Sequence, residues 1–523
     1  MKEYVIVAKS EADIDSLHAE LVAKGTEVAD LVPLNELMYH YMLDDEEAAK
    51  LATDPRVAAI HYKLPASAAR PHVAPDVTET PRAYNNTAGN FARRATNPDL
   101  YNVNWGLRRA TLNTTESTTE STTGTTYAAD RDGTGVDIVI MDDGVQSGHP
   151  EFGARLQTGF DWYAGAGVTG TMPTGFYDYS IYGEAEHGTH VAGIAAGKTY
   201  GAAKGANVYS LRIFDHTTSG PAKSFDPYTA FDLLRAWHIR KNTAGPHYTG
   251  RPTIVNMSWG YVWYYSDNPN RTSQKTINKI VYEGSTTNYS SYTQYLSSKG
   301  MVGSEHCVTD AATDTRIAQG QAAGIVYITA AGNYGHKIDV SGGPDYNNYY
   351  THPFSGSIAP ANTPIYYHRG GSPIGTVRVS ASDSVTVKSG NTYLEQLAYY
   401  SERGPGCDVI SPGTDITSST SNSSSFSPFS YVFGTQSQNT YKAAKIAGTS
   451  MATPQVTGVV ALYLQGNPTA TPAQVKTWVA TQAKSSQVYN PTSSTNAWTN
   501  STALLGAPNK YLYNPYHSGY SGA

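Results

Sequence analysis

The sequence predicts an α/β protein whose mainly parallel sheet is covered by helices on both faces. From residue 135 onward, short apolar runs typical of buried strands recur, and segments with apolar residues at helical spacing lie between them. Apolar strands that alternate with helices are typical of parallel sheets buried on both sides. We expect the functional residues at the carboxyl ends of these strands. The predicted strands are Gly135–Met141, Asn207–Ile213, Thr253–Met257, Gly324–Thr329 and Gly375–Ser380.

A smaller unit precedes this sheet, at about residues 1–69. It begins with a strand-like run at Tyr4–Ala8 and continues with a predicted helix at Glu11–Lys24. Two strand-like runs, a helix with an acidic first turn and a last strand follow, so the predicted order is βαββαβ. This order predicts a ferredoxin-like fold, which by itself indicates no function. The last four predicted elements are Glu27–Val32, Glu36–Leu43, Asp44–Ala52 and Arg56–Tyr62.

A polar stretch at residues 70–134 connects the two units. Between Thr111 and Thr123 the run Thr-Glu-Ser-Thr-Thr occurs twice. Such a segment lacks the apolar residues needed to bury itself, so we expect an exposed connector.

The composition excludes several classes of protein. Charged residues make up 15% of the 523 residues, against roughly 25% in an average protein, and the formal net charge is -6. Nucleic acid is not an expected partner, because a phosphate-binding surface needs clustered Lys and Arg. Two cysteines are too few for a disulfide scaffold or a four-cysteine zinc site.

Export and membrane signals are also missing from the sequence. The apolar run at Tyr4–Ala8 is shorter than the core of a signal peptide, which has about 7–15 residues. No run approaches the ~18 apolar residues of a membrane span. We therefore expect neither a signal peptide nor a membrane partner.

Three residues that together suit nucleophilic catalysis stand at predicted strand or helix ends. Asp142 directly follows the first strand of the sheet, His187 stands at a helix start packed with small residues, and Ser450 opens a later helix. A serine hydroxyl is a weak nucleophile at neutral pH and needs a base, which the His187 imidazole would supply. A buried carboxylate at Asp142 would orient the ring. Asp143 is an alternative, but the alternation along the strand favours Asp142.

The three residues and their surroundings resemble the subtilisin-like serine proteases, most closely the proteinase K branch. The chain order Asp, His, Ser is that of subtilisin. The resemblance implies a subtilisin-like three-layer domain at residues 135–515, with a short tail at residues 516–523. It implies hydrolysis of polypeptides through an acyl-enzyme intermediate, without a cofactor for the chemistry. The similar stretches are Asn104–Leu107, Gly148–Phe152, His187–Gly197, Ser411–Asp415, Gly448–Pro454 and Pro508–Tyr513.

The resemblance also assigns a role to residues 1–69, which look like the family's propeptide. Such a propeptide chaperones folding and inhibits the enzyme until it is removed. We expect its tail after Tyr62 to lie in the cleft and to be cut autocatalytically near Ala69. A second candidate cleavage site is Phe91-Ala92-Arg93-Arg94.

Further site residues follow from the same resemblance. Asn333 would donate its side-chain amide to the oxyanion, together with the backbone N–H of Ser450. Substrate would be clamped as an added strand between two backbone edges. Trp259 stands where the family usually has Leu, so it either narrows a side-chain pocket or packs only against the adjacent insertion. The expected substrate-binding residues are Ser219, Gly220, Ser258, Trp259, Gly260, Ala331 and Gly332.

Several positions depart from the family or have uncertain roles. Gln455 replaces the family's usual His, and His190 is expected to be a packed helix residue and not a second base. The resemblance implies that Asp408 is a ligand of a structural calcium ion. Cys307 and Cys407 either form one disulfide or are two buried thiols.

Two enlarged loops, at about 261–320 and 334–371, are rich in tyrosine, of which the chain has 40. We expect them to deepen the cleft or to contact an assembly partner. A rival hypothesis is a structural or virion-associated protein on a subtilase scaffold, with vestigial or auxiliary protease activity. The complete set of Asp142, His187, Ser450 and Asn333 favours an active enzyme. On either hypothesis we expect an extracellular or virion-associated location.

Overall fold

The computed structural model describes a large part of the chain, including both predicted units. The described residues are 1–29, 35–63, 69–71, 91–92, 104–112, 115, 126–170, 172, 185–214, 224–264, 279–282, 284–288, 305–308, 310–351, 363–364, 375–422, 429–433, 436–491 and 502–521.

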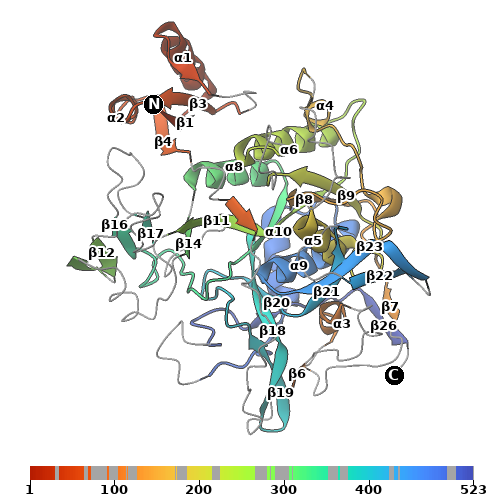
Figure 1. The fold of residues 1–523 in the computed structure, drawn as a ribbon. Helices are drawn as coiled ribbons and strands as arrows, with labels where there is room; N and C mark the ends of the chain where they lie inside the picture. Colours follow the sequence, from red (N-terminus) through yellow and green to blue (C-terminus); the bar gives the residue numbers. More distant parts are fainter. Residues whose placement is uncertain are drawn as a thin grey trace.

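A sheet of mainly parallel strands forms the centre of the molecule (Figure 1). Its strand order is β24-β25-β20-β18-β15-β10-β8-β9, and the six strands from β20 to β9 are parallel. All five predicted strands are confirmed, while β20 was not predicted. The strands are β8 (Asp137–Asp142), β9 (Asn207–Arg212), β10 (Thr253–Met257), β15 (Val326–Ala330), β18 (Val377–Ser389), β20 (Val409–Pro412), β24 (Lys484–Ser485) and β25 (Lys510–Tyr511).

Helices cover both faces of this sheet, and strand β8 shows how. Ile138 and Ile140 pack into one hydrophobic core with α5 and α9, whereas Val139 and Met141 pack into a second core with α6. Successive side chains of a strand point to opposite faces, so one all-apolar strand serves two cores. The three-layer α/β architecture is thus confirmed. The helices are α5 (Glu186–Ala196), α9 (Thr449–Gly466) and α10 (Pro472–Gln482) on the first face, and α6 (Pro227–Asn242) and α8 (Ala311–Ala322) on the second.

The N-terminal residues fold as a separate four-stranded antiparallel sheet with two helices (Figure 1). The strand order is β2-β3-β1-β4, and the predicted βαββαβ order is confirmed. Asp44 begins the second helix with a capping box that also involves Glu47. The elements are β1 (Lys2–Ala8), α1 (Glu11–Ala23), β2 (Glu27–Val28), β3 (Met38–Leu43), α2 (Asp45–Leu51) and β4 (Val57–Tyr62).

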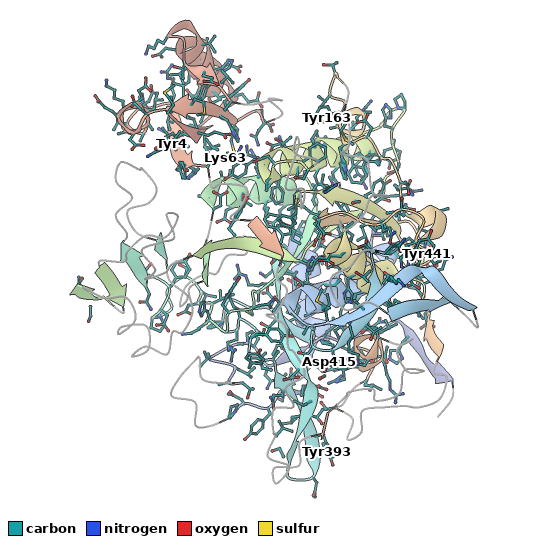
Figure 2. The ribbon with its side chains drawn as sticks, viewed as in Figure 1. Tyr4, Lys63, Tyr163, Tyr393, Asp415 and Tyr441 are labelled. Atoms are coloured by element: carbon teal, nitrogen blue, oxygen red, sulfur yellow. The ribbon has the colours of Figure 1, made fainter. Side chains whose placement is uncertain are left out.

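This N-terminal domain packs on helices α6 and α8. A small apolar cluster joins Val5, Val7 and Met38 of its sheet to Tyr228 and Ala312 of the two helices. Figure 2 shows Lys63 at this junction, where its ammonium pairs with Asp226, the residue that caps α6, at 3.1 Å. The N-terminal sheet therefore covers helices that belong to the outer layer of the larger domain.

Shorter elements surround the central sheet. Their bounds are β5 (Ala69–Pro71), β6 (Phe91–Ala92), α3 (Trp105–Arg109), β7 (Thr126–Ala129), η4 (Gly153–Arg155), α4 (Trp162–Ala166), β11 (Trp259–Tyr264), β12 (Lys279–Tyr282), β13 (Ser285–Asn288), β14 (Glu305–Val308), β16 (Tyr349–Thr351), β17 (Thr363–Pro364), β19 (Thr392–Leu397), β21 (Ile416–Thr420), β22 (Phe429–Phe433), β23 (Gln436–Ile446) and β26 (His517–Ser521).

Large parts of the connector and of the two enlarged loops lie outside the described residues. The described parts of the loops include β12, β13, β16 and β17, which form one antiparallel sheet of their own. A search of the described helices for one that is both long and apolar enough to span a bilayer finds none.

Candidate active site

Asp142 and His187 form a buried pair at the carboxyl end of strand β8. Asp142 is the last residue of β8, and His187 lies in the first turn of α5. Their Oδ1 and Nδ1 atoms are 2.8 Å apart, and both side chains are almost fully buried. Burial alone would lower the pKa of His187, but the facing carboxylate of Asp142 more than offsets it, so the pKa is raised above its ordinary value. The ring is thus held in one orientation by a charge.

Asp143 has a different task from Asp142. Its Oδ2 accepts a hydrogen bond from the backbone N–H of His187 at 3.1 Å, and its Oδ1 accepts one from Gly188 at 2.6 Å. These N–H groups belong to the first turn of α5 and have no partner within the helix. Asp143 therefore caps the helix that carries His187, while Asp142 contacts the ring.

Ser450 lies in the first turn of α9, which packs against α5. Its Oγ donates to the carbonyl of Ser258 at 2.8 Å, and the Oγ of Ser258 donates to the carbonyl of Ser450 at 2.9 Å. Proline at position 454 explains the second bond. It has no N–H, so the Ser450 carbonyl lacks its usual partner four residues on and is available to Ser258.

The serine and the histidine are not hydrogen-bonded to each other in this conformation. Nε2 of His187 is buried and has no hydrogen-bond partner among the described residues. The acceptor that a serine hydroxyl needs is therefore in place on α5, while the Ser450 hydroxyl is turned toward Ser258. Catalytic hydrogen bonds often form only when substrate binds, so this geometry is compatible with a nucleophile that rotates.

Asn333 lies beside the start of α9. Its Oδ1 accepts hydrogen bonds from both the backbone N–H and the hydroxyl of Thr449, each at 2.9 Å. Because the oxygen and nitrogen of a planar amide are attached to one carbon at a fixed angle, this pair of hydrogen bonds also fixes where the amide N–H groups point. The hydroxyl of Thr449 in turn accepts from the N–H of Gly332 at 3.2 Å. Thr449, which the sequence analysis did not single out, thus locks the predicted oxyanion donor in place.

Gly332 has a backbone conformation with φ of +124°. A Cβ there would lie 2.6 Å from the carboxyl carbon of Glu402, whose side chain is buried. Glycine is therefore required by conformation and by space. The preceding residue, Ala331, is buried and donates its N–H to the carbonyl of Val379.

Strand β11 presents the edge that was predicted to hold substrate. It begins at Trp259, directly after Ser258, and residues 69–71 of strand β5 pair with it in antiparallel register. The paired residues are Trp259 with Pro71, Gly260 with Arg70, and Tyr261 with Ala69. Residues 69–71, which follow the N-terminal domain in the chain, therefore occupy the edge at Trp259–Tyr261, which includes two of the three residues predicted to hold substrate. Ser219 and Gly220, expected on the opposite edge, lie outside the described residues.

Trp259 is a core residue. Its side chain is 1% exposed and packs among Phe214, Phe231 and Tyr261. Trp259 was predicted either to narrow a substrate pocket or to pack only against the adjacent enlarged loop. Neither prediction describes its surroundings fully, because Phe214 and Phe231 lie outside that loop. The large indole fills space within the second core of the domain, and only its backbone takes part in the pairing with β5.

Three further positions from the sequence analysis are buried or hydrogen-bonded within the fold. His190 is buried, its Nε2 lies 3.0 Å from the carbonyl of Ala444, and burial lowers its pKa to about 3. The Gln455 amide donates to Asn104, which caps α3. Cys407 is a buried free thiol, so no disulfide joins it to Cys307. Burial raises the pKa of the Cys407 thiol to about 12.

Asp408, the residue expected to bind calcium, is paired with a lysine. Its Oδ2 accepts from the backbone N–H of Arg378 at 2.8 Å and pairs with the ammonium of Lys476 at 3.0 Å. Calcium needs six to eight oxygen ligands, and an ammonium beside the carboxylate repels a dication. In the described part of the chain, no group of three His, Cys, Asp or Glu side chains lies close enough together to hold a metal ion.

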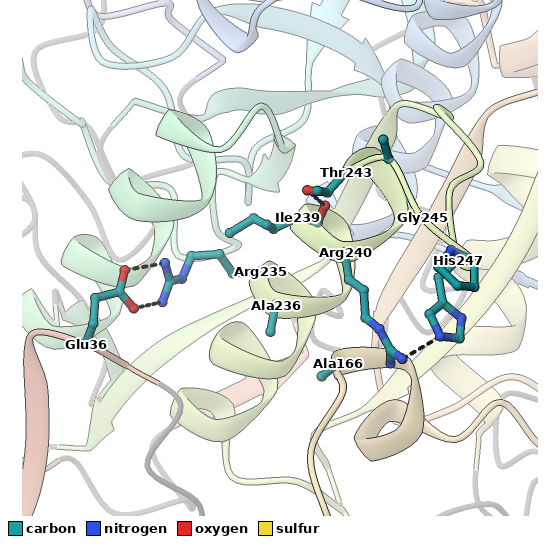
Figure 3. A pocket seen from close by; sticks show the side chains of 11 residues that line it. Glu36, Ala166, Arg235, Ala236, Ile239, Arg240, Thr243, Gly245 and His247 are labelled. Carbon is teal, nitrogen blue, oxygen red and sulfur yellow. Dashed lines mark hydrogen bonds and ion pairs between the residues drawn. The ribbon is translucent and has the colours of Figure 1, made fainter.

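A cavity of about 570 Å³ lies away from these residues, between the N-terminal domain and the end of α6 (Figure 3). Glu36 of the N-terminal domain points into it and meets Arg235 of α6 through two contacts of 2.5 and 2.8 Å. Arg240 points to His247 on the opposite side. None of the predicted site residues that the structure describes lines this cavity, so it is not the candidate active site.

Comparisons with known proteins agree with the fold and the motifs. The family model described as "Subtilase family" matches residues 133–504. An extracellular serine proteinase of Thermus sp. (strain Rt41A) is 26% identical over 472 residues, which cover 90% of this chain and 74% of that protein. Alkaline serine exoprotease A of Vibrio alginolyticus is 26% identical over 395 residues, 76% of this chain and 49% of that protein.

A solved structure is similar over nearly the whole chain. Fervidolysin from Fervidobacterium pennivorans, described as a keratinolytic enzyme related to subtilisin, gives a TM-score of 0.52 at 20% identity. The match covers 97% of this chain and 60% of fervidolysin. At this identity the likeness concerns the fold. The assignment to the proteinase K branch stays a prediction.

Proposed function

The chain belongs to the subtilase family of serine endopeptidases, and we propose that Asp142, His187 and Ser450 are its catalytic triad. The observation that carries the proposal is the buried 2.8 Å pair between Asp142 and the His187 ring, whose Nε2, on the other side of the ring, has no hydrogen-bond partner among the described residues. A base with one nitrogen anchored and the other open can accept a proton from a nucleophile. The start of α9 brings Ser450 to the neighbouring helix.

The reaction starts when the Ser450 hydroxyl turns from the Ser258 carbonyl to Nε2 of His187. The oxygen attacks the carbonyl carbon of the peptide while Nε2 takes the proton, and Asp142 stabilises the resulting imidazolium without being protonated. The same proton then passes to the leaving amine as the C–N bond breaks, which leaves an acyl group on Ser450. Water, deprotonated by His187, hydrolyses this ester and restores the hydroxyl.

Two hydrogen-bond donors would stabilise the negative charge that develops on the substrate oxygen. One is the side-chain amide of Asn333, whose orientation is fixed by the two bonds from Thr449. The other is the backbone N–H of Ser450 at the start of α9, where the helix dipole favours an anion. The substrate itself would be held as an added strand between the edge of Ser258–Gly260 and the edge of Ser219 and Gly220, with Ala331 and Gly332 next to Asn333 as further contacts.

A labelling experiment tests the triad. A fluorophosphonate probe reacts only with a serine whose hydroxyl is activated, so we expect wild-type protein to be labelled and Ser450→Ala to remain unlabelled. Ser485→Ala, which removes a serine from the exposed β24, is the matched control and should be labelled as wild type. Labelling that persists in Ser450→Ala would place the nucleophile elsewhere. Wild-type protein without labelling would favour a scaffold with vestigial activity.

We further propose that residues 1–69 are a propeptide that is cut by the same site. The pairing of β5 with β11 supports this, because the polypeptide runs antiparallel along Trp259–Tyr261 and its direction leads toward Ser258, the partner of Ser450. Phe91 and Ala92 pair instead with Thr386 and Val385 of β18, which favours the first of the two candidate cleavage sites. We expect the cut within a few residues of Ala69.

Intact-mass measurement tests self-processing. Wild-type protein should lose about 70 residues from its N-terminus on incubation, whereas Ser450→Ala should keep its full mass. Loss of the same segment in Ser450→Ala at an equal rate would mean that another protease makes the cut. The processed enzyme would act on polypeptides, and an extracellular location would match the Thermus relative's description.

A further inference from the structure

Three segments that are distant in the sequence meet at one corner of the larger domain. Thr376 lies just before strand β18, Asp408 just before β20, and Lys476 in the middle of helix α10. The Lys476 ammonium donates to the carbonyl of Thr376 at 2.8 Å and lies 3.0 Å from Oδ2 of Asp408. One cation therefore joins the starts of two parallel strands to the helix that covers them.

The surroundings of this ammonium are those of a small cation site. A backbone carbonyl and a carboxylate converge on it, and both are oxygen ligands of the kind that hard cations prefer. Asp408 is held in place by a further bond, from the N–H of Arg378 to the same Oδ2 at 2.8 Å. The carbonyl of Thr376 belongs to a residue that is 2% exposed, so its position is set by the sheet and not by the lysine.

A calcium ion and this lysine exclude each other. Calcium binds oxygen at about 2.3–2.6 Å, so an ion bound to Asp408 and Thr376 would occupy nearly the same space as the ammonium. The two positive charges would also repel each other at that distance. The same aspartate that the sequence predicts as a calcium ligand is thus already neutralised by a residue of this chain.

We propose that Lys476 supplies internally the positive charge of a structural cation, so that this corner of the fold needs no metal ion. The inference is independent of the proposed catalytic roles, because it concerns the stability of the sheet. Its consequence reaches the active site nonetheless. Strand β18 binds Ala331 through Val379, and β20 leads to Gly413, whose carbonyl accepts from the N–H of Gly448 at the start of α9.

The lysine can be removed without disturbing a core, since its side chain is 40% exposed. Lys476→Met keeps the aliphatic stem and removes the charge, which leaves Asp408 and the Thr376 carbonyl available to an ion and its water ligands. The variant should therefore acquire a calcium dependence that we do not expect in the wild-type chain. Lys476→Gln serves as a second variant, because its amide can still donate to Thr376.

The experiment compares melting temperatures in the Ser450→Ala background, where self-digestion is absent. Each protein is measured in 5 mM EDTA and in 5 mM calcium chloride. We expect wild type to melt at the same temperature in both, and Lys476→Met to melt about 2 °C or more lower in EDTA and to recover part of this loss in calcium. Lys510→Met is the matched control and should show no calcium response, because among the described residues its ammonium donates only to the exposed Ser485.

The proposal is tested by the calcium response, which is the difference between the melting temperatures in calcium and in EDTA, of each lysine variant compared with wild type. A larger response in Lys476→Met, or in Lys476→Gln if the first variant does not fold, supports the proposal. An equal response in wild type and variant, or no response in either, overturns it. A response of wild type that Asp408→Asn abolishes also overturns it, because calcium would then bind at Asp408 in the presence of the lysine.

Discussion

The active-site region and the contact between the N-terminal domain and helices α6 and α8 both gather charged side chains, but they hold them differently. In the active site, Asp142 and His187 are at most 2% exposed, and each is fixed by a neighbour on a rigid strand or helix. At the interdomain contact, the Glu36 side chain is 43% exposed where it meets Arg235, and Asp226 is 29% exposed where it meets Lys63.

This difference separates a permanent geometry from a contact that can be released. Exposed ion pairs contribute only about 0–1 kcal/mol each, since water replaces the partner at little cost. A fully buried pair cannot be separated so cheaply, because one uncompensated charge would remain in the interior. The buried pair therefore keeps a fixed distance, whereas the half-exposed pairs can be released, as the proposed removal of residues 1–69 would require.

The largest expected effect separates Asp142 from Asp143. Asp142→Asn should lower kcat/KM by roughly 10⁴, because the amide no longer stabilises the imidazolium or holds its tautomer. Asp143→Asn retains an oxygen that can accept from the helix N–H groups, so we expect it to keep most activity and lose about 1 kcal/mol of stability. Steady-state kinetics on a peptide substrate and thermal melts measure both. Equal loss of activity in the two variants would contradict this division of roles.

Asn333→Ala tests the second fixed element of the site. Loss of one oxyanion donor lowers kcat by ~10²–10³ in subtilisin, a relative, and we expect a similar loss here with KM little changed. The matched variant is Thr449→Val, which removes the hydroxyl that binds Asn333 but leaves the backbone N–H bond. It should lose less activity than Asn333→Ala. A larger loss in Thr449→Val would mean that Thr449 acts other than by orienting the amide.

The interdomain contact also includes a buried charge, Arg316, which should matter more than the exposed charges. Arg316 is 2% exposed and joins Asp232 at 2.9 Å to His40 of the N-terminal domain at 3.0 Å. In the Ser450→Ala background, Arg316→Met should raise hydrogen exchange of the β1–β4 amides about tenfold, since breaking a buried charge pair costs more than about 1.4 kcal/mol. Glu36→Gln should raise hydrogen exchange of the same amides about twofold or less.

Exchange in the larger domain provides the control for this experiment. The amides of β8 and β10 should be unaffected by either substitution if only the contact is weakened. An equal effect of Arg316→Met on β8 and on β1 would show that the arginine stabilises the larger domain and not the contact.

The sequence was informative where local pattern decides structure. All-apolar runs such as Ile138–Met141 predicted the buried parallel strands, and the alternation along β8 pointed to Asp142 as the residue that faces the ring. The sequence could not predict pairings that depend on how distant segments meet. The reciprocal bonds of Ser258 and Ser450 need β10 and α9 in contact, and the place of Lys476 beside Asp408 needs α10 over the sheet.

Trp259 shows the same limit in a different way. The family pattern made it a candidate pocket residue, but the aromatic residues that surround it come from three separate segments, including Phe214 and Phe231. Its burial reflects packing of large side chains that no local pattern encodes. In contrast, the role of Thr449 was within reach, since it adjoins Ser450 in the motif and a hydroxyl there can serve as a helix-start donor.

The smallest expected effect is a shift along the pH axis. His187 must be neutral to accept the serine proton, so reactivity rises with pH through its pKa. Because Asp142 raises this pKa above the ordinary 6.5, the acidic limb of the fluorophosphonate reaction should have its midpoint above pH 6.5. Asp142→Asn removes the carboxylate charge that raises the pKa of His187, while the burial that lowers this pKa remains. The midpoint should therefore move to lower pH, and the maximal rate should be much smaller. Rates of fluorophosphonate labelling between pH 5 and 9 give the midpoint of the acidic limb in both proteins. An unchanged midpoint would mean that the buried pair orients the ring without tuning its charge, and the contrast with the releasable interdomain charges would then be one of geometry alone.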